Sequence, residues 1–201
     1  MALSAALTAI STRQQTVARI VAAARECFAE NGVEATRMDH IARRADLSRA
    51  YLYRFVSGRD ELVELAILAR LNELGIELAD QADQHNGNLA DALLDRITAG
   101  LRSGRDDPEF RNLAEGMHRT RLNWILTATD SPVHRITARM FGDLYTRAGA
   151  EGALIDGIEA EVLYDWLQGV MALFASRDDL DDTQIRNQLR TFVLPSIIRT
   201  P

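Results

Sequence analysis

Lysine is absent from this sequence of 201 residues, so all 23 basic side chains are arginines. A guanidinium group can form two parallel hydrogen bonds with a phosphate or with the edge of guanine, which an ammonium group cannot do. Codon usage can produce the same bias. Cysteine occurs only once, at Cys27, which excludes an internal disulfide and a cysteine-based metal cluster. A lone cysteine also fits a reducing compartment.

Long hydrophobic runs are also missing. No apolar stretch approaches the ~20 residues that a membrane-spanning helix needs. Residues 1–12 are mildly apolar but lack the positive segment of a secretory signal. We therefore expect a flexible N-terminal arm over residues 1–12, a cytoplasmic protein and no membrane partner.

Catalytic motifs are not visible either. The sequence shows no glycine-rich phosphate loop and no nucleophile–base–orienter set. His118 and His134 lack ligand-like spacing with carboxylates. We predict no catalytic residue, no metal site and no cofactor, and an all-helical enzyme is the least favoured class of function.

The charge is unevenly distributed. The net charge is -6, yet residues 1–62 hold nine Arg and seven acids, a balance of +2. The remainder holds fourteen Arg and twenty-two acids, a balance of -8. Residues 36–59 hold six Arg against Asp39 and Asp46, a balance of +4. A local basic face on an acidic body is typical of nucleic-acid binding.

The basic segment has the pattern of two short helices around a turn. Thr36 and Asp39 resemble a capping box that begins a helix over residues 37–45. Residues 46–48 form the turn, and Ser48 caps a second helix over residues 49–56. A longer helix over residues 12–31 precedes them, with Gly32 at its C-terminal end. The pattern predicts a three-helix module over residues 13–60.

Several matched positions identify a family resemblance. The run Phe28-Ala-Glu-Asn-Gly32, then Ala35-Thr36, Ile41-Ala42, Leu47-Ser48, Leu52-Tyr53 and Arg59-Asp60-Glu61-Leu62 resembles the TetR family of transcriptional repressors over residues 14–66. Asp46 stands where the turn usually has glycine, and Asp tolerates a left-handed backbone at moderate cost. Phe55 stands where the family often has a His or Tyr that contacts phosphate.

The second helix of such a module enters the major groove. Arg49, Tyr51 and Arg54 are the predicted groove-reading residues. Thr36 and Ser48 lie at predicted helix N-termini, where a hydroxyl and free N–H groups suit a phosphate of the DNA backbone. The resemblance implies further backbone contacts from Arg37, Tyr53 and Arg59, and Arg44 is a weaker candidate. For one arginine alone, a solvated surface is the simpler explanation; the whole set at this spacing favours double-stranded DNA.

The rest of the chain is also predicted to be helical. Helical periodicity and cap-then-proline signals place helices over residues 59–84, 89–102, 108–127, 132–148, 157–176 and 182–194. The fold class is therefore all-α, with about nine helices. A helix-turn-helix domain would be followed by an effector-binding and dimerisation domain over residues 61–201.

Apolar stripes on the last two helices are predicted to join two copies of the chain, as the resemblance implies. The predicted dimer residues are Ile158, Val162, Trp166, Val170, Leu173, Ile185, Leu189 and Phe192. The alternative is that these stripes face the monomer's own core, and periodicity cannot separate the two. A two-fold dimer would match an operator of two inverted half-sites.

An effector site is implied by the resemblance more than by the residues, because methionines and aromatics at helical spacing are usually core. The candidates are Met117, Arg121, Trp124, Met140, Tyr145 and Trp166. The predicted effector is a small hydrophobic or amphipathic molecule. The predicted function is a homodimeric repressor that such an effector releases from DNA; a regulator without a small ligand, or an activator, is the alternative.

Overall fold

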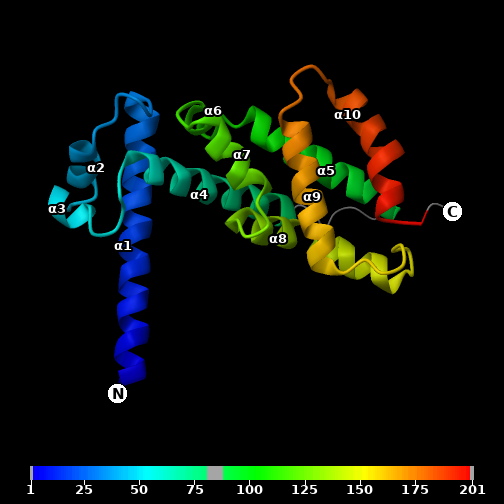
Figure 1. Ribbon diagram of the computed structural model, residues 1–201, viewed down its shortest axis with the longest axis horizontal. Helices are drawn as coiled ribbons and strands as arrows, with labels where there is room; N and C mark the ends of the chain where they lie inside the picture. Colours follow the sequence, from blue (N-terminus) through cyan, green and yellow to red (C-terminus); the bar gives the residue numbers. More distant parts are fainter. Residues whose placement is uncertain (1, 81–87, 200–201) are drawn as a thin grey trace. The chain divides into compact units, whose positions relative to one another are not determined.

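The computed structural model describes residues 2–80 and 88–199 and is built from helices (Figure 1). The α-helices are α1 (Ala2–Asn31), α2 (Met38–Arg44), α3 (Arg49–Leu52), α4 (Arg59–Asp80), α5 (Leu89–Asp106), α6 (Pro108–Glu115), α7 (Arg119–Thr127), α8 (Pro132–Ala150), α9 (Ala160–Ala175) and α10 (Asp182–Gln188). The described residues contain no strand, only an isolated bridge between Leu154 and Ile198. The all-α prediction is confirmed.

Several boundaries differ from the prediction, and the predicted end of the helix over residues 59–84 lies outside the described residues. Helix α1 begins at Ala2, not near Thr12, because no glycine or proline precedes Gly32 and alanine strongly favours helix. The predicted helix over residues 108–127 is two helices, α6 and α7, separated near Gly116. The last helix becomes a π-helical turn at Leu189–Val193 and a 3-10 turn at Leu194–Ser196, since Pro195 cannot supply an α-helical N–H donor.

The chain forms two compact units. The first comprises the residues up to Ala69 together with Pro108–His118, and the second comprises Arg70–Asp107 and the residues from Arg119 onward. Helix α4 therefore begins in the first unit and ends in the second. None of the described helices has the length and apolar character that crossing a bilayer requires.

The core of the first unit lies where α1, α2 and α3 meet. Its largest fully buried side chains include Ile20, Phe28, Ile41 and Leu52. Helix α6 joins this unit through polar anchors: the Arg25 guanidinium donates to the Glu109 carboxylate at 2.6 Å, and Asn112 donates to the Phe28 carbonyl at 3.1 Å. Gly116 is required here, because a Cβ at this position would lie 2.5 Å from the Val33 side chain.

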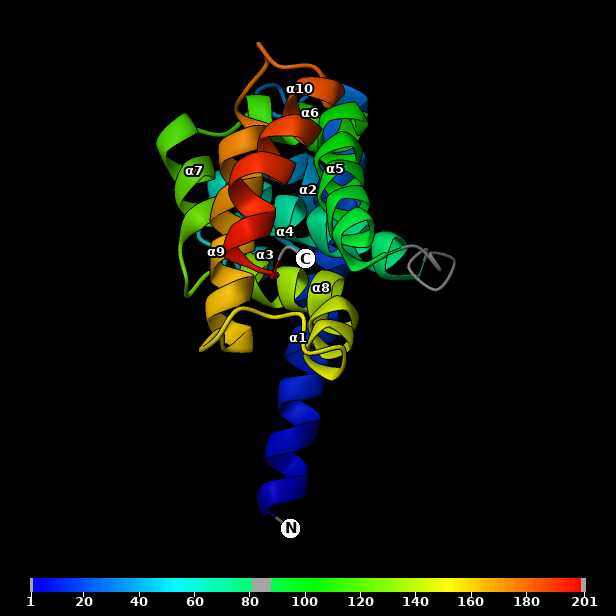
Figure 2. The ribbon, with the colours of Figure 1, turned by 90° about the vertical axis from the view of Figure 1, so that its right-hand side faces the viewer.

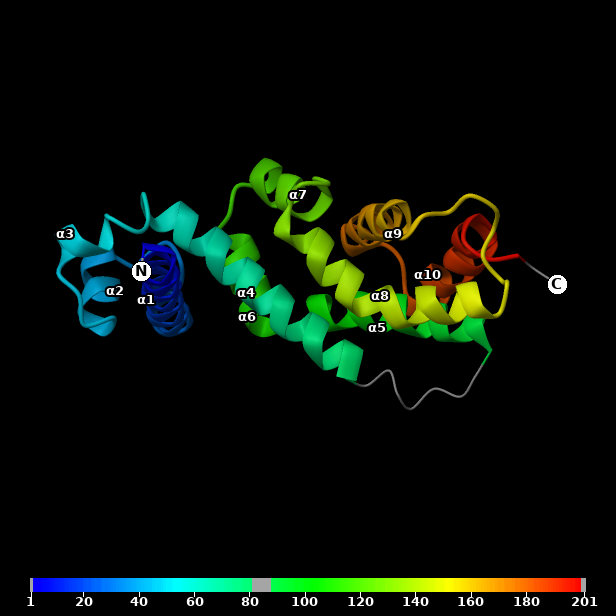
Figure 3. The ribbon, with the colours of Figure 1, turned by 90° about the horizontal axis from the view of Figure 1, so that it is seen from below.

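The core of the second unit lies between α5, α8 and α9, which pack against one another (Figures 2 and 3). Met140 on α8 is surrounded closely. A Cβ at Gly75 would lie 3.6 Å from its Cγ, and a Cβ at Gly100 would lie 3.1 Å from its Cε. The buried Arg96 guanidinium joins α5 to α8 by donating to the Met140 carbonyl and, at 3.1 Å, to both oxygens of Asp143.

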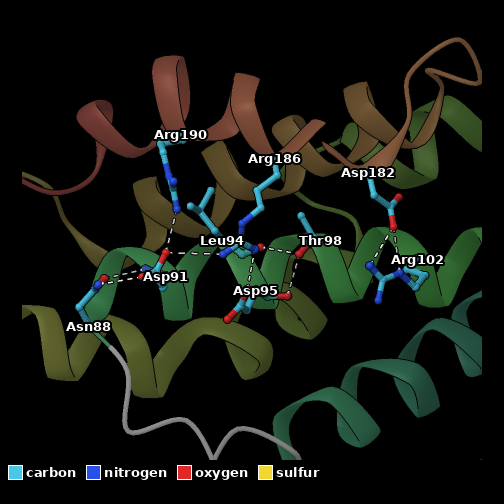
Figure 4. Close-up of polar contacts among 9 residues, drawn as sticks. All are labelled: Asn88, Asp91, Leu94, Asp95, Thr98, Arg102, Asp182, Arg186 and Arg190. Atoms are coloured by element: carbon cyan, nitrogen blue, oxygen red, sulfur yellow. Dashed lines mark hydrogen bonds and ion pairs between the residues drawn. The ribbon is translucent and has the colours of Figure 1, made fainter. Parts of the chain in front are cut away.

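Helix α10 and the π-helical turn are attached to α5 by a row of ion pairs (Figure 4). Asp91 accepts from Arg190 at 2.9 Å, and Asp95 accepts from Arg186 at 2.5 Å. In a further pair, at 2.8 Å, the helices exchange roles: Arg102 on α5 supplies the positive charge and Asp182 on α10 the negative one. These charges fix the direction of α10 along α5 but contribute little stability each, because every one of them is at least partly exposed to solvent.

Candidate nucleic-acid interface

The turn between α2 and α3 is set by hydrogen bonds and a left-handed residue. The Leu47 N–H donates to the Ala42 carbonyl at 2.9 Å, and the Asp46 N–H donates to the Arg43 carbonyl at 3.2 Å. This pair of bonds is a Schellman motif, which needs a left-handed residue after the helix. Asp46 supplies it with a φ of 54°. The sequence-based expectation for Asp46 is confirmed.

Helix α3 has a single α-helical turn and then continues as tighter turns. The Ser48 hydroxyl accepts from the Tyr51 N–H at 3.2 Å and caps the helix. The Phe55 N–H donates to the Leu52 carbonyl at 2.9 Å. We call residues 49–56 the α3 segment. Its Leu52 and Val56 are buried in the first unit's core and Phe55 is half-buried, whereas the other side chains of the segment are exposed.

Two tyrosines and two arginines form the exposed side of this segment. Tyr51 and Tyr53 are 40% and 41% exposed, which is unusual for large apolar rings and leaves them available to a partner. The Arg49 guanidinium lies 5.7 Å from the Tyr53 ring centre, and the Arg54 guanidinium lies 5.3 Å from the Tyr51 ring centre. Each arginine is therefore held against an aromatic face.

Asp39 on α2 adds a negative charge at the edge of this surface. It lies 3.1 Å from Arg49 and 4.0 Å from Arg37. Arg37 is 74% exposed, so its guanidinium remains accessible. The predicted groove-reading and backbone-contacting arginines thus lie beside each other, with one carboxylate shared between two of them.

Other predicted contacts are engaged within the protein. The Arg44 guanidinium donates to both oxygens of Glu30 at 2.6 Å and to Glu26 at 3.2 Å. These hydrogen bonds hold the pKa of Glu30 below its ordinary value. Arg59 donates to the Glu34 carbonyl at 2.9 Å and stays 41% exposed. The sequence signal for the Arg44 pairing is the spacing of Glu26 and Glu30, one turn apart on α1.

Thr36 lies in a different place from the one expected. It is 3% exposed, and its hydroxyl donates to the carbonyls of Gly32 at 2.7 Å and Cys27 at 3.0 Å. Helix α2 is capped by Arg37 without a side-chain hydrogen bond, so the expected capping box of Thr36 and Asp39 is absent. The Thr36 hydroxyl ties the end of α1 to the start of α2 and does not face solvent.

The predicted dimer residues divide into two groups. Val170, Ile185 and Leu189 are buried in the core of the second unit, and Ile158 is half-buried. Val162, Trp166, Leu173 and Phe192 are exposed by 60%, 48%, 58% and 72%. Periodicity could not make this division, because each helix has apolar residues on more than one side.

The predicted effector residues are not brought together in one cluster. Arg121 stacks on Trp124 at 4.3 Å, and both are exposed. Met140 and Tyr145 belong to the packed region around α8, and the exposed Trp166 donates to the Ser196 hydroxyl at 3.1 Å. The other candidate, Met117, lies in the first unit.

Sequence reasoning missed two buried polar atoms in the second unit. Gln168 is 2% exposed; its amide nitrogen donates to the carbonyls of Leu126 and Ala128, while its Oε1 has no hydrogen-bond donor among the described residues. The Nε2 of His134 pairs with Glu161 at 2.7 Å, and its Nδ1 is buried and similarly without a partner in the described structure. Unsatisfied buried polar atoms are uncommon and call for a partner.

The fold and this surface define an all-helical chain with an N-terminal helix-turn-helix module. Residues 20–66 match the family model described as "Bacterial regulatory proteins, tetR family". The N-terminal part of the chain is therefore similar to this family of regulatory proteins over those residues.

A similarity to HTH-type regulators is also found over part of the chain. The HTH-type transcriptional repressor Rv3405c of Mycobacterium tuberculosis is 33% identical over 112 residues, which are 51% of this chain and 57% of that protein. The chain thus spans little more than half the length of this relative.

Solved structures show the same fold. The TetR family repressor AlkX of a Dietzia species aligns with a TM-score of 0.59 and 23% identity, over 88% of this chain and 92% of its own. RolR, solved with resorcinol, aligns with a TM-score of 0.65 and 16% identity, over 93% of this chain and 89% of its own.

Proposed function

We propose that this protein is a transcriptional repressor that binds an inverted-repeat operator in double-stranded DNA as a homodimer. The observation that carries the proposal is the outward face of the α3 segment, where arginines are held on exposed tyrosine rings. Inserted in a major groove, Arg54 and Arg49 would contact guanine edges and Tyr51 would pack on a thymine methyl group or contact a phosphate. Such a protein acts in the cytoplasm.

The backbone contacts would come from groups around this face. Arg37 and Tyr53 are exposed, and Arg59 keeps free N–H groups beyond the one that bonds the Glu34 carbonyl. Arg44 would contribute only if it exchanged the Glu30 carboxylate for a phosphate, because both terminal nitrogens of its guanidinium already donate to Glu30. We therefore rank Arg44 below the others.

DNA selection tests this proposal directly. The full chain should enrich a two-fold-symmetric sequence from a random duplex pool. Arg49→Ala should relax the sequence preference, whereas Arg59→Ala should weaken binding to all sequences and flatten the salt dependence. Failure of the wild-type protein to bind any duplex at low salt would refute the proposed function.

The exposed apolar residues of α9 support the homodimer. Val162, Trp166 and Leu173 recur at spacings of four and seven residues, which places them on one face of the helix. Gly169 lies between them, and a Cβ there would meet no atom within 4 Å. An exposed apolar stripe with a small residue at its centre suits close packing of a second copy of the same helix.

Sedimentation equilibrium of a charge variant tests the homodimer. In a two-fold dimer each copy contributes its own residue 173, so Leu173→Asp would bury two carboxylates in the interface. The variant should therefore shift a micromolar sample from dimer to monomer. The control is Ile76→Asp, which alters a residue 38% exposed on α4, away from this stripe. A wild-type protein that sediments as a monomer, or a Leu173→Asp protein that remains dimeric, would refute this interface.

The buried Gln168 Oε1 and His134 Nδ1, which have no hydrogen-bond partner among the described residues, support an effector site in the second unit. A molecule with hydroxyl donors could satisfy Gln168 Oε1 and His134 Nδ1, and the Tyr164 ring, 6.3 Å from the His134 ring, would pack against its apolar part. Resorcinol, with which RolR was solved, has this chemistry. The proposed effector is thus a small amphipathic molecule with hydroxyl groups.

Release from DNA requires that the effector bind two conformations of the protein with different affinity. Helix α4 is the proposed connection, because it is one continuous helix that belongs to both units. A thermal-shift screen of phenols and alcohols, followed by release from the selected duplex, tests this step. Compounds that stabilise the wild type should lose their effect in Gln168→Leu. If no compound releases the protein from the selected duplex, a regulator without a small ligand is favoured. If the protein raises expression of a reporter gene placed behind the selected duplex, an activator is favoured.

A further inference from the structure

The arginines of the first unit differ in what surrounds them. Arg25, Arg44 and Arg49 each have a carboxylate within 3.2 Å. Arg13 and Arg54 are exposed and, within the described structure, form no ion pair; each instead lies over an aromatic ring. A positive charge without a carboxylate is the kind that can neutralise a DNA phosphate without first giving up a partner.

These two arginines are the ends of one continuous row. The Arg13 guanidinium lies 5.2 Å from the Phe55 ring centre, and Phe55 meets Tyr51 edge to face with ring centres 5.1 Å apart. Tyr51 in turn carries Arg54 at 5.3 Å. We call Arg13, Phe55, Tyr51 and Arg54 the arginine–aromatic row. It joins α1 to the segment predicted to read the groove.

Phe55 is the informative member of this row. Its ring cannot donate or accept an ordinary hydrogen bond, so it cannot hold a phosphate itself. Its face attracts a guanidinium, and a long arginine side chain loses rotamer freedom when it rests on a ring. Phe55 therefore positions Arg13 beside the exposed face of the α3 segment before any DNA arrives.

We propose that Arg13 is a further DNA contact, a phosphate-binding arginine positioned by Phe55. The DNA-binding surface then extends from the α3 segment to the N-terminal half of α1. This inference rests on the proposed DNA-binding function. Because a phosphate contact carries no sequence information, Arg13 contributes equally to all duplexes.

The test measures DNA affinity of the full-length protein by fluorescence anisotropy at several KCl concentrations. The probes are a duplex enriched by the wild type from a random pool and an unrelated duplex of equal length. Arg13→Gln should weaken binding to both probes roughly tenfold. It should also lower the slope of log K against log salt by about 0.9 for each bound protomer.

The matched control is Arg19→Gln, which removes the same charge from an exposed arginine of α1 that has no aromatic partner in the described structure. Its affinity and salt slope should stay close to those of the wild type. If Arg13→Gln and Arg19→Gln behave alike, the inference is wrong although DNA binding itself stands. If the wild type enriches no duplex from the random pool, the proposed function is wrong instead.

Substitutions of Phe55 test the positioning role. Phe55→Leu keeps the charge of Arg13 but removes the ring. It should weaken the binding of both probes by a smaller factor than Arg13→Gln does. Combined with Arg13→Gln it should add almost nothing, because both changes remove the same contact. Phe55→Tyr keeps an aromatic ring at this position, so its salt slope should equal that of the wild type. Fully multiplicative effects of the two substitutions would overturn the positioning by Phe55, and circular dichroism confirms that each variant is folded.

Discussion

The left-handed residue in the α2–α3 turn allows backbone strain and charge to be separated at one position. Asp46 has a φ of 54°, a region that costs an ordinary L-residue about 1–2 kcal/mol and glycine almost nothing. Asp and Asn tolerate it because their short polar side chains can hydrogen-bond locally. Alanine has no such compensation. Asp46→Ala should therefore destabilise the first unit by about 1 kcal/mol.

Two further variants at the same position complete the argument. Asp46→Gly removes the steric cost but increases the freedom of the unfolded chain, which costs about 0.4–1 kcal/mol. The two effects nearly cancel, so Asp46→Gly should be close to the wild type in stability. Asp46→Asn keeps the backbone preference and should also match it. The expected order of stability places Gly, Asn and Asp together and Ala below them.

The assay must report on the first unit. Both tryptophans, Trp124 and Trp166, belong to the second unit, so intrinsic tryptophan fluorescence would follow the wrong transition. Amide hydrogen exchange of residues 38–56 measures the local opening free energy directly. An alanine variant as well protected as the glycine variant would refute the claim that strain at Asp46 governs this turn.

The same variants test the charge. Asp46 is exposed, two residues before the cap of α3, so in the proposed complex its carboxylate would repel DNA phosphates bound nearby. Asp46→Asn and Asp46→Gly should both bind DNA several-fold more tightly at low salt, and the gain should shrink as salt screens the repulsion. Unchanged affinity in both would place the carboxylate away from the DNA.

Three further predictions concern the first unit. Thr36→Val removes the hydroxyl that donates to two carbonyls and should lower the free energy of unfolding by about 1–2 kcal/mol. Its DNA affinity at low salt should stay unchanged, and weaker DNA binding by a fully folded variant would show that Thr36 does contact a phosphate. Burial raises the pKa of the Cys27 thiol above 9.0, so a disulfide reagent at pH 8 should label it only on unfolding, and rapid labelling of the native protein would contradict this burial. Arg44 lowers the pKa of Glu30 below 4.5. The stability from this pair is therefore present above pH 4.5 and lost as the pH falls through the lower, folded-state pKa. In urea unfolding, Glu30→Gln should therefore converge on the wild type only below that folded-state pKa, and a difference that stays constant with pH would argue against the pairing.

Local signals determined much of the first unit. The Ser48 cap, the left-handed Asp46 and the outward placement of Tyr51 and Arg54 all depend on residues within a few positions of one another. Helix type and approximate position in the rest of the chain also followed from periodicity and from prolines at helix starts, such as Pro132. These features are set by the backbone's own hydrogen bonds and by the 3.6-residue repeat, which the sequence displays directly.

Contacts between distant segments were decided only by the tertiary structure. Arg44 and Arg13 look alike in the sequence, yet Arg44 is neutralised by Glu30, whereas Arg13 lies on the Phe55 ring and forms no ion pair with any described residue. Val170 and Leu173 belong to the same apolar pattern, yet one is 4% and the other 58% exposed. The physical reason is that the charge environment and burial of a side chain depend on which other elements pack against its helix. A periodic pattern in the sequence does not identify those elements.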